Sequence, residues 1–376
     1  MDKNPESSRL PSLDGWRAVS IAIVLAAHSS YLARFPVGLK HEVGILTDAG
    51  NLGVRFFFVI SGFLITWLLL GEHAAGSGQG ISLTNFYIRR LLRIFPVYFF
   101  FLAVVGGLQM VTPFTQDTRT WLGNLTFSTN FFGDGRLTGH LWSLAIEEQF
   151  YLLWPGTFLL FGLAANPRRA FGILAIPIFL GPVSRIVVCK HYYPDTLEWF
   201  FRYFPTTSFA DSLAVGCVCA FVLFHQRERV AGGLRKSGGR LPAAGFLLLL
   251  IPCWMNQFQL PGRLIALTGH TLQAAGFAIL LLDSVIAPEK SIYQFLNHRL
   301  VKHIGVLSYS IYIWQQIFCN PQLLGLNPQT WWMSFPGWLV PGVLVALLSY
   351  YGLEMPFFRL RKRYGSTQKE ALKTGL

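Results

Sequence analysis

The sequence predicts an all-α polytopic membrane protein with about ten transmembrane helices and both termini in the cytosol. Of its 376 residues, 52% are hydrophobic and only 13% are charged. A soluble chain carries about 25% charged residues. The formal net charge is +13, but the basic residues lie between apolar runs rather than on one domain, so we expect no nucleic-acid partner. The five scattered cysteines match neither a disulfide framework nor a zinc site, so we expect no metal.

Ten apolar runs follow one another along the chain, each long enough for a helix that crosses a bilayer. Such a helix needs about 20 mainly apolar residues. Proline and glycine recur inside the runs, and membrane helices tolerate both. We therefore expect a single transmembrane domain over residues 1–376, with cytosolic tails at 1–12 and 356–376. The candidate spans are about 13–32, 52–70, 93–112, 141–163, 170–188, 206–224, 241–258, 263–285, 304–320 and 336–355.

The basic residues indicate the orientation of these spans, because Lys and Arg accumulate in cytosolic segments of membrane proteins. With the N-terminus placed in the cytosol, 22 of the 31 Lys and Arg residues fall in cytosolic segments and nine fall on the opposite side. This bias predicts that both termini lie in the cytosol.

The first run carries Arg17 and His28, eleven residues apart. In a helix this spacing puts both side chains on one face, roughly 16 Å apart along the axis. His28 then lies about 21 Å into the hydrocarbon core, where an imidazole is a candidate general base. The alternative is a structural hydrogen bond between helices. Arg17 is either functional or an interfacial residue with Trp16 as aromatic anchor, and Asp14 is a helix cap or a partner for Arg17.

Polar residues in the second and fourth runs reach a similar predicted depth. Counted from the outer side, Ser61 lies roughly 12–13 Å deep and Glu147 about 10 Å deep, close to the level of His28. Glu147 shares one helical stripe with Ser143 and Tyr151. A carboxylate in hydrocarbon needs a partner, and an Arg or His on another helix is the natural one. The alternative is a purely structural ion pair.

The segment NFYIRRLLRIFP places Arg89, Arg90 and Arg93 on one side of a helix start. Guanidinium groups bind phosphates bidentately, whereas the alternative is a topology signal that contacts anionic lipids. Weaker candidates, more often structural, lie in later runs: Asp211, Tyr309, Gln315 and Glu354.

Six motifs occur in order over nearly the whole chain. An LDGLRA-type opening with the R-x10-H spacing matches 13–18 and His28, and a GVxxFFVxSGFLI segment matches Gly53 to Ile65. Further along stand FYxRRxxRIxP from Phe86 to Pro96 and WSLxxExQFY from Trp142 to Tyr151. A glycine-serine-tyrosine segment then follows from Gly305 to Tyr312, and Y-x-x-E-x-P runs from Tyr351 to Pro356. Together these motifs resemble the acyltransferase-3 family of membrane-bound bacterial acyltransferases.

The resemblance implies O-acylation, often O-acetylation, of a hydroxyl on a cell-envelope or exported carbohydrate. It implies acetyl-CoA or another acyl-CoA as donor substrate and no permanently bound cofactor. The expected partners are acyl-CoA, a carbohydrate or lipid-linked glycan acceptor and the lipid bilayer. The expected location is the bacterial cytoplasmic (inner) membrane, and the expected form lacks the soluble hydrolase domain that some members carry.

The resemblance also implies roles for individual residues. His28 deprotonates the acceptor hydroxyl or transiently carries the acyl group, and Glu147 orients or charges the imidazole. The residues expected to hold the donor are Arg17, Arg89, Arg90 and Arg93. The residues expected to bind substrate or support the site are Asp14, Ser61, Trp142, Ser143, Gln149, Tyr151, Asp211, Tyr309 and Glu354.

Two positions depart from the family pattern. Gln315 follows Trp314 where many members have histidine, and Phe209 precedes Asp211 where many have an R-x-D pattern. Both departures concern details of the acceptor.

A rival hypothesis is a secondary transporter of an anionic solute that uses Arg17, His28 and Glu147 as substrate and proton groups. Transporters often contain internal repeats, and the segments RRLLR and EEQFY have no counterpart in residues 190–376. A third hypothesis is an inactive family member that binds an envelope lipid, which the presence of both Arg17 and His28 argues against.

Overall fold

The regular structure is helical throughout the residues that the computed structural model describes, which are 10–32, 50–75, 81–132, 135–192, 206–257, 262–327, 330–333 and 336–364. The long helices are α1 (Leu13–Leu32), α3 (Gly50–Ala75), α4 (Leu83–Val111), α7 (Leu141–Leu160), α8 (Pro167–Tyr192), α9 (Ala210–Lys236), α10 (Arg240–Gln257), α11 (Gly262–Ile286), α13 (Arg299–Cys319) and α14 (Leu339–Ser349). Shorter helices are α5 (Thr118–Leu125), α6 (Thr129–Phe132), α12 (Ser291–Asn297) and α15 (Met355–Arg361).

Each predicted apolar run overlaps one long helix, so the all-α, multi-pass class is confirmed. By length and composition, five helices among the described residues can cross a membrane, or up to six if α9 and the start of α10, bent by 87°, form one span. The number of ten spans and the cytosolic position of both termini therefore stay predictions. The last run continues from α14 through a π-helical turn, Tyr350–Glu354, into α15.

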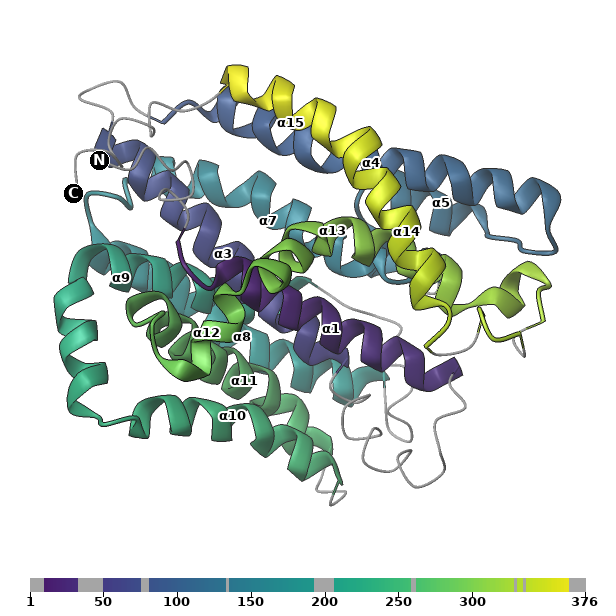
Figure 1. Ribbon diagram of the computed structural model, residues 1–376. Coiled ribbons are helices and arrows are strands. Elements are labelled where there is room, and N and C mark those ends of the chain that lie inside the picture. Colours follow the sequence, from purple (N-terminus) through teal and green to yellow (C-terminus); the bar gives the residue numbers. More distant parts are fainter. Residues whose placement is uncertain are drawn as a thin grey trace.

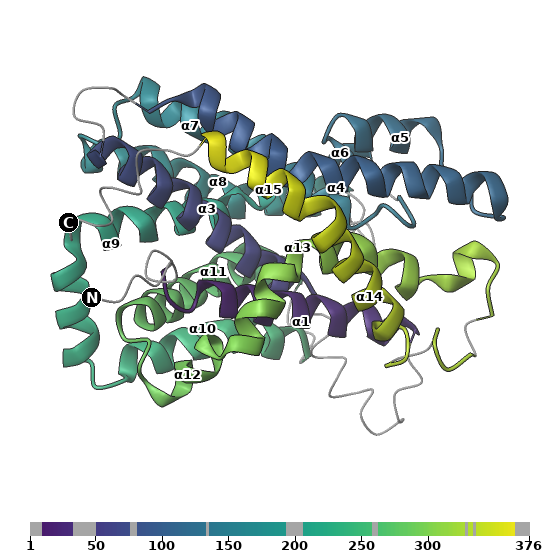
Figure 2. The ribbon, with the colours of Figure 1, turned by 45° about the horizontal axis from the view of Figure 1, so that its top comes forward.

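Helices distant in the sequence pack side by side. Figures 1 and 2 show α1 (purple) lying along α13 (green), and α15 (yellow) lying along α4 (blue). α3 packs against both α1 and α9, while α10 packs against α11 at the edge of the bundle. The arrangement brings the first helix of the chain into contact with helices from its middle and its end.

Glycines allow two of these helix pairs to approach at backbone distance. A Cβ on Gly216 of α9 would lie 2.1 Å from the carbonyl oxygen of Val59 in α3, and one on Gly62 would lie 2.0 Å from that of Leu213. Where α1 meets α13, a Cβ on Gly305 would lie 1.7 Å from the carbonyl oxygen of Asp14. Small residues at helix crossings are the usual route to close packing in membranes, where lipid offers no hydrophobic drive for association.

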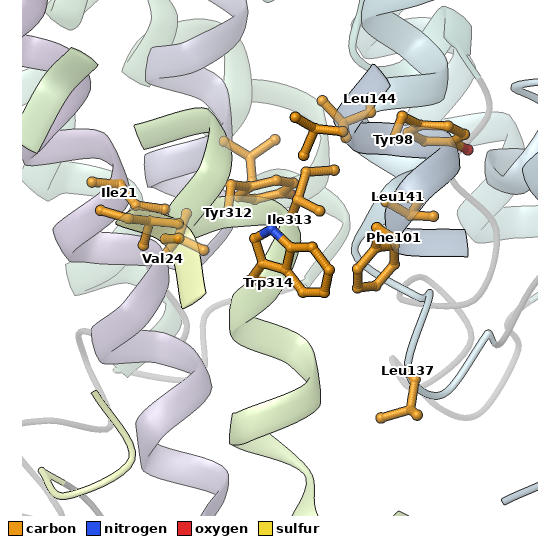
Figure 3. Close-up of a cluster of buried hydrophobic side chains, with 14 of the residues drawn as sticks. Ile21, Val24, Tyr98, Phe101, Leu137, Leu141, Leu144, Tyr312, Ile313 and Trp314 are labelled. Carbon is orange, nitrogen blue, oxygen red and sulfur yellow. The ribbon is translucent and has the colours of Figure 1, made fainter. Parts of the chain in front are cut away.

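An apolar layer crosses the middle of the bundle. Ile21 and Val24 of α1 belong to a buried cluster with Phe101 of α4, Leu141 of α7 and Tyr312 of α13 (Figure 3). Ile21 and Val24 stand between Arg17 and His28 on α1. The apolar layer therefore separates these two polar residues, which were predicted to share one face of the helix.

Trp16 is also part of the core. Its side chain is 8% exposed, its ring packs edge-on against Phe277 with centroids 5.1 Å apart, and its Nε1 donates to Ser284 Oγ at 2.9 Å. The interpretation of Trp16 as an interfacial anchor is therefore wrong, because α11 covers the side chain.

Candidate active site

A cavity opens between α1, α3, α4, α7 and α13. The cavity and its mouth hold about 770 Å³ of empty space, which includes space open to the outside. Apolar side chains of α3 and α4 form much of the wall. The polar lining residues are Arg17, Ser61, Arg90, Arg93, Ser143, Glu147, Tyr151, Ser308, Tyr309 and Tyr312. Most of the lining side chains that can carry chemistry had been selected from the sequence, although they come from five separate helices.

The stripe predicted on the fourth run faces this cavity. Ser143, Glu147 and Tyr151 are four residues apart on α7, and all three line the wall. The Glu147 carboxylate accepts a hydrogen bond from Ser61 Oγ at 3.0 Å on one oxygen and from the Tyr151 hydroxyl at 3.1 Å on the other. The Tyr151 hydroxyl is also 2.9 Å from Ser61 Oγ. Two helices thus hold the carboxylate in a fixed orientation.

Three guanidinium groups surround this network. The Arg90 guanidinium lies over the Tyr151 ring, 5.1 Å from its centroid. Arg17 and Arg93 are near enough to Glu147 to attract its carboxylate and near enough to each other to repel. Against three arginines, Glu147 is the one acidic residue in the described lining. The described lining therefore holds more basic than acidic side chains, and the carboxyl groups of Asp14, Glu148 and Glu354 attract the same arginines from outside the lining.

Arg89 is oriented differently from its neighbours Arg90 and Arg93. Its guanidinium forms an ion pair with Glu72 near the end of α3 and donates to the carbonyl oxygen of Tyr364 at 3.0 Å. The side chain does not line the described cavity. Arg89 thus ties α3 and α4 to the segment after α15, so its expected role in holding the donor is not supported.

His28 lies outside the cavity lining, past the apolar layer. Its Nδ1 is 3.0 Å from Oε1 of Gln315 on α13. The hydrogen bonds of Glu147 go to Ser61 and Tyr151, so the expected pairing of Glu147 with His28 is absent from the described contacts. Residue counting along apolar runs gives only the depth of a side chain, whereas a contact between helices also depends on the rotation and lateral position of each helix.

Tyr312 connects the cavity to His140, whose imidazole is near enough to His28 for the two rings to interact electrostatically. Its hydroxyl lies 2.6 Å from Ser143 Oγ and donates to the carbonyl oxygen of His140 at 2.8 Å. The His140 ring donates from Nε2 to the carbonyl oxygen of Ile313 at 3.1 Å, and its Nδ1 is buried without a hydrogen-bond partner in the described structure. Sequence reasoning missed His140, although its position three residues before Ser143 on the same stripe could have shown it.

Three other predicted residues support the walls. Trp142 packs its ring against Phe209, with centroids 4.9 Å apart. The Gln149 amide donates to the carbonyl oxygen of Phe127 at 2.9 Å. Tyr309 lines the cavity and donates to the carbonyl oxygen of Ile94 at 2.8 Å.

Asp14 and Glu354 stand at the edges of the site. Asp14 lies in the first turn of α1, where its backbone meets Gly305, and its carboxylate attracts the Arg17 guanidinium. Glu354 ends the π-helical turn and accepts a hydrogen bond from Ser310. Its carboxylate is buried and attracts Arg93.

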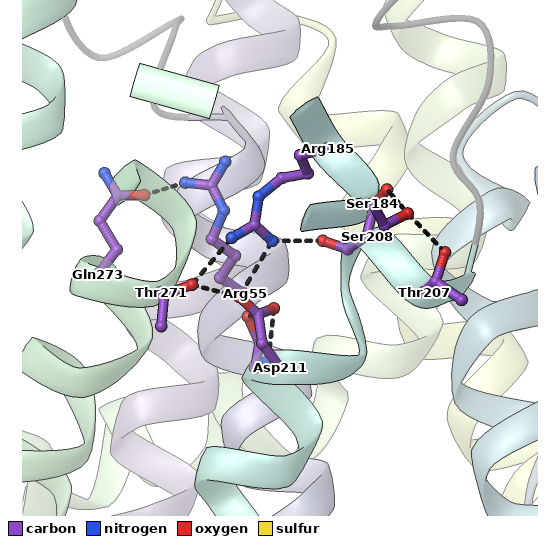
Figure 4. Close-up of polar contacts among 9 residues, drawn as sticks. Arg55, Ser184, Arg185, Thr207, Ser208, Asp211, Thr271 and Gln273 are labelled. Carbon is purple, nitrogen blue, oxygen red and sulfur yellow. Dashed lines mark hydrogen bonds and ion pairs between the residues drawn. The ribbon is translucent and has the colours of Figure 1, made fainter. Parts of the chain in front are cut away.

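Asp211 belongs to a second buried polar cluster, outside the cavity lining (Figure 4). Its carboxylate forms an ion pair with Arg185 at 3.0 Å and accepts from Thr271 Oγ1 at 2.6 Å. Nearby, Arg55 donates to Gln273. The cluster joins α8, α9 and α11 to the start of α3, so Asp211 has a structural place. Phe209 cannot supply a positive charge to Asp211, and Arg185 on α8 supplies one instead.

Comparison with protein families agrees with the motifs. A model described as an acyltransferase domain matches residues 10–352. This chain belongs to the acyltransferase-3 family. The match covers every residue that lines the cavity, together with His28, His140 and Gln315.

Curated relatives include bacterial O-acetyltransferases. The chain is 28% identical over 368 residues to the peptidoglycan O-acetyltransferase OatA of Listeria monocytogenes, covering 92% of this chain and 55% of the relative. It is 27% identical to the putative peptidoglycan O-acetyltransferase YrhL of Bacillus subtilis, and the match covers 92% of this chain and 54% of the relative. It is 30% identical to the O-acetyltransferase OatA of Staphylococcus aureus, and the match covers 81% of this chain and 50% of the relative. The chain spans about half the length of these relatives, and no solved structure matched it.

Proposed function

We propose that this protein is a membrane-embedded O-acyltransferase that moves a short acyl group, most simply acetyl, from acyl-CoA to a hydroxyl of a cell-envelope carbohydrate. One observation carries the proposal. An open cavity with three guanidinium groups lies at one end of the α1 face, and an imidazole lies at the other end. Family membership supports acyl transfer, and the names of the curated relatives support acetyl as the group and peptidoglycan as the acceptor class.

The donor occupies the cavity lined by Arg17, Arg90 and Arg93, which we call the arginine cavity. Guanidinium forks match the geometry of phosphate oxygens and keep their charge at any physiological pH. Arg17, Arg90 and Arg93 come from two helices and reach one cavity, so they can bind the phosphates of one acyl-CoA molecule together. Its pantetheine arm extends past Tyr312 toward His28. By the predicted orientation, the cavity opens to the cytosol, where acyl-CoA is present.

His28 acts as the general base. In direct transfer, the imidazole takes the proton of the acceptor hydroxyl while the hydroxyl oxygen attacks the thioester carbonyl carbon. The carbon–sulfur bond then breaks, and the leaving thiolate receives the proton from the imidazolium. An acyl-histidine route passes through the same residue in two steps and gives the same products. In both routes the acceptor approaches from the outer side of the cytoplasmic membrane.

The Glu147 network serves the donor in this proposal. Its carboxylate is hydrogen-bonded to Ser61 and Tyr151 and attracts both Arg17 and Arg93. It therefore holds two mutually repelling guanidinium groups in one cavity. This role replaces the expected role of Glu147 in orienting His28.

Purified protein in liposomes tests the proposal. Labelled acetyl-CoA is supplied with peptidoglycan fragments, and mass spectrometry measures O-acetylated product. We expect the wild type and the exposed-site control His303→Ala to form product, and His28→Ala to lose about 10²-fold or more of the rate, the contribution of a general base. Product formation by His28→Ala at the wild-type rate would refute the assignment of the base. Uptake of an anionic solute without acyl-CoA turnover would favour the transporter hypothesis.

A further inference from the structure

The contact between His28 and Gln315 has a defined chemical direction. An amide oxygen accepts hydrogen bonds and cannot donate them. Oε1 of Gln315 faces Nδ1 of His28 at 3.0 Å, so a neutral His28 must carry its proton on Nδ1. The lone pair then resides on Nε2, which is the atom that can accept a proton from a substrate.

The surroundings of Gln315 keep its amide in place. The side chain is 1% exposed, on the part of α13 that packs along α1. Its neighbours Trp314 and Ile313 belong to the buried apolar layer (Figure 3). A side chain this buried has little access to water as an alternative hydrogen-bond partner, although the imidazole of His28 itself is half-buried. The Gln315 contact is therefore a durable constraint on the imidazole.

The chemistry of glutamine differs from that of a histidine at the same position. A primary amide does not titrate, so it presents the same acceptor oxygen at every pH. An imidazole can present either a donor or an acceptor, depending on its tautomer and charge. Gln315 is thus a constant partner for the imidazole at every pH.

We propose that Gln315 is a positioning residue that holds His28 as the Nδ1–H tautomer and thereby makes Nε2 the base of the acyl transfer. The inference rests on the proposed function for its catalytic part, whereas the tautomer is a property of the protein alone. Gln315 does not touch the reacting atoms. It acts through the imidazole, as second partners of functional histidines commonly do.

The first experiment measures the tautomer without any substrate. Full-length protein labelled with ¹⁵N-histidine is placed in lipid nanodiscs, and the His28 signals are assigned by their loss in His28→Asn. We expect a protonated Nδ1 and an unprotonated Nε2 in the wild type. In Gln315→Leu, which removes the acceptor oxygen, we expect a mixture of both tautomers. Gln315→Glu keeps an acceptor oxygen and should keep the wild-type pattern.

The second experiment measures steady-state transfer by the same variants. We expect Gln315→Leu to lower kcat roughly 10²-fold and to leave KM for acyl-CoA unchanged, since the arginine cavity is separate. Gln315→Glu should retain much more activity than Gln315→Leu. The matched control is Gln316→Leu, because the neighbouring amide donates to the carbonyl oxygen of Arg136 instead. That variant should keep the wild-type tautomer and kcat.

Two results would overturn the inference: an Nε2–H tautomer in the wild type, or an Nδ1–H tautomer that persists in Gln315→Leu. An unchanged kcat in a Gln315→Leu protein whose tautomer has shifted would overturn its catalytic part. A Gln315-dependent Nδ1–H signal in a protein that transfers no acyl group would support the tautomer assignment and overturn the proposed function instead.

Discussion

Arg89, Arg90 and Arg93 lie within five residues of one another and have different surroundings. Arg90 and Arg93 line the cavity, whereas Arg89 pairs with Glu72. Successive residues of a helix point about 100° apart, so neighbouring side chains of a single motif reach different partners. A charge cluster in a sequence therefore does not act as one unit.

This difference predicts unequal effects on donor binding. We expect Arg93→Gln to raise the Kd for acyl-CoA roughly 10- to 100-fold, the effect of losing a charge-assisted hydrogen bond to phosphate. Arg89→Gln, the matched control, should leave that Kd within a factor of about two. Isothermal titration calorimetry in detergent measures both. Equal losses for the two variants would mean that the cavity is not the donor site.

At the scale of elements, helix contacts made by glycine decide how near the polar side chains can come. Ser61 lies next to Gly62 on α3, and Gly62 and Gly216 let α3 and α9 touch at the backbone. The same helix α3 delivers Ser61 to Glu147 on α7. A change in the α3–α9 spacing would therefore shift one wall of the cavity.

Substitution of Gly216 tests this contact. In Gly216→Ala the added Cβ would meet the Val59 carbonyl oxygen at 2.1 Å, so the helices must separate, at a cost of about 1–3 kcal/mol. The control is Gly232→Ala on the same helix, where nothing lies within 4 Å of an added Cβ. We expect a lower melting temperature for Gly216→Ala alone, measured by thermal denaturation in detergent. An unchanged melting temperature would show that the crossing can relax without loss of stability.

At the scale of the whole molecule, contacts gather several helix ends on the side of the arginine cavity. Arg89 near the start of α4 contacts Glu72 near the end of α3 and Tyr364 after α15. Ser12, just before α1, bonds to Ser284 near the end of α11 and to Asn297 at the end of α12. The predicted orientation puts this side of the bundle in the cytosol.

The sidedness of donor use tests that orientation. Proteoliposomes are prepared with the protein inserted in one known direction, and acyl-CoA is supplied to one face at a time. We expect turnover only from the face that carries the start of α4, because acyl-CoA is charged and does not cross a bilayer. Turnover from the opposite face alone would reverse the predicted topology.

The membrane class, the helix ranges and most polar cavity residues could be predicted from the sequence. Hydrophobic run length is a local property, and a bilayer imposes nearly the same length on every span. The stripe of Ser143, Glu147 and Tyr151 could be predicted for the same reason, because residues four apart share one face of any helix. Family motifs then identified Arg17, Arg90 and Arg93 as candidates for one site.

Partner choice was decided only by the tertiary structure. Glu147 bonds to Ser61 and Tyr151 rather than to His28, which bonds to Gln315. Depth along a helix is a single coordinate, whereas a hydrogen bond also needs the rotation and lateral position of both helices. Those two quantities come from close contacts such as Gly305 against the Asp14 backbone. The sequence by itself therefore identified most of the polar residues that line the cavity, and helix packing determined which of them meet.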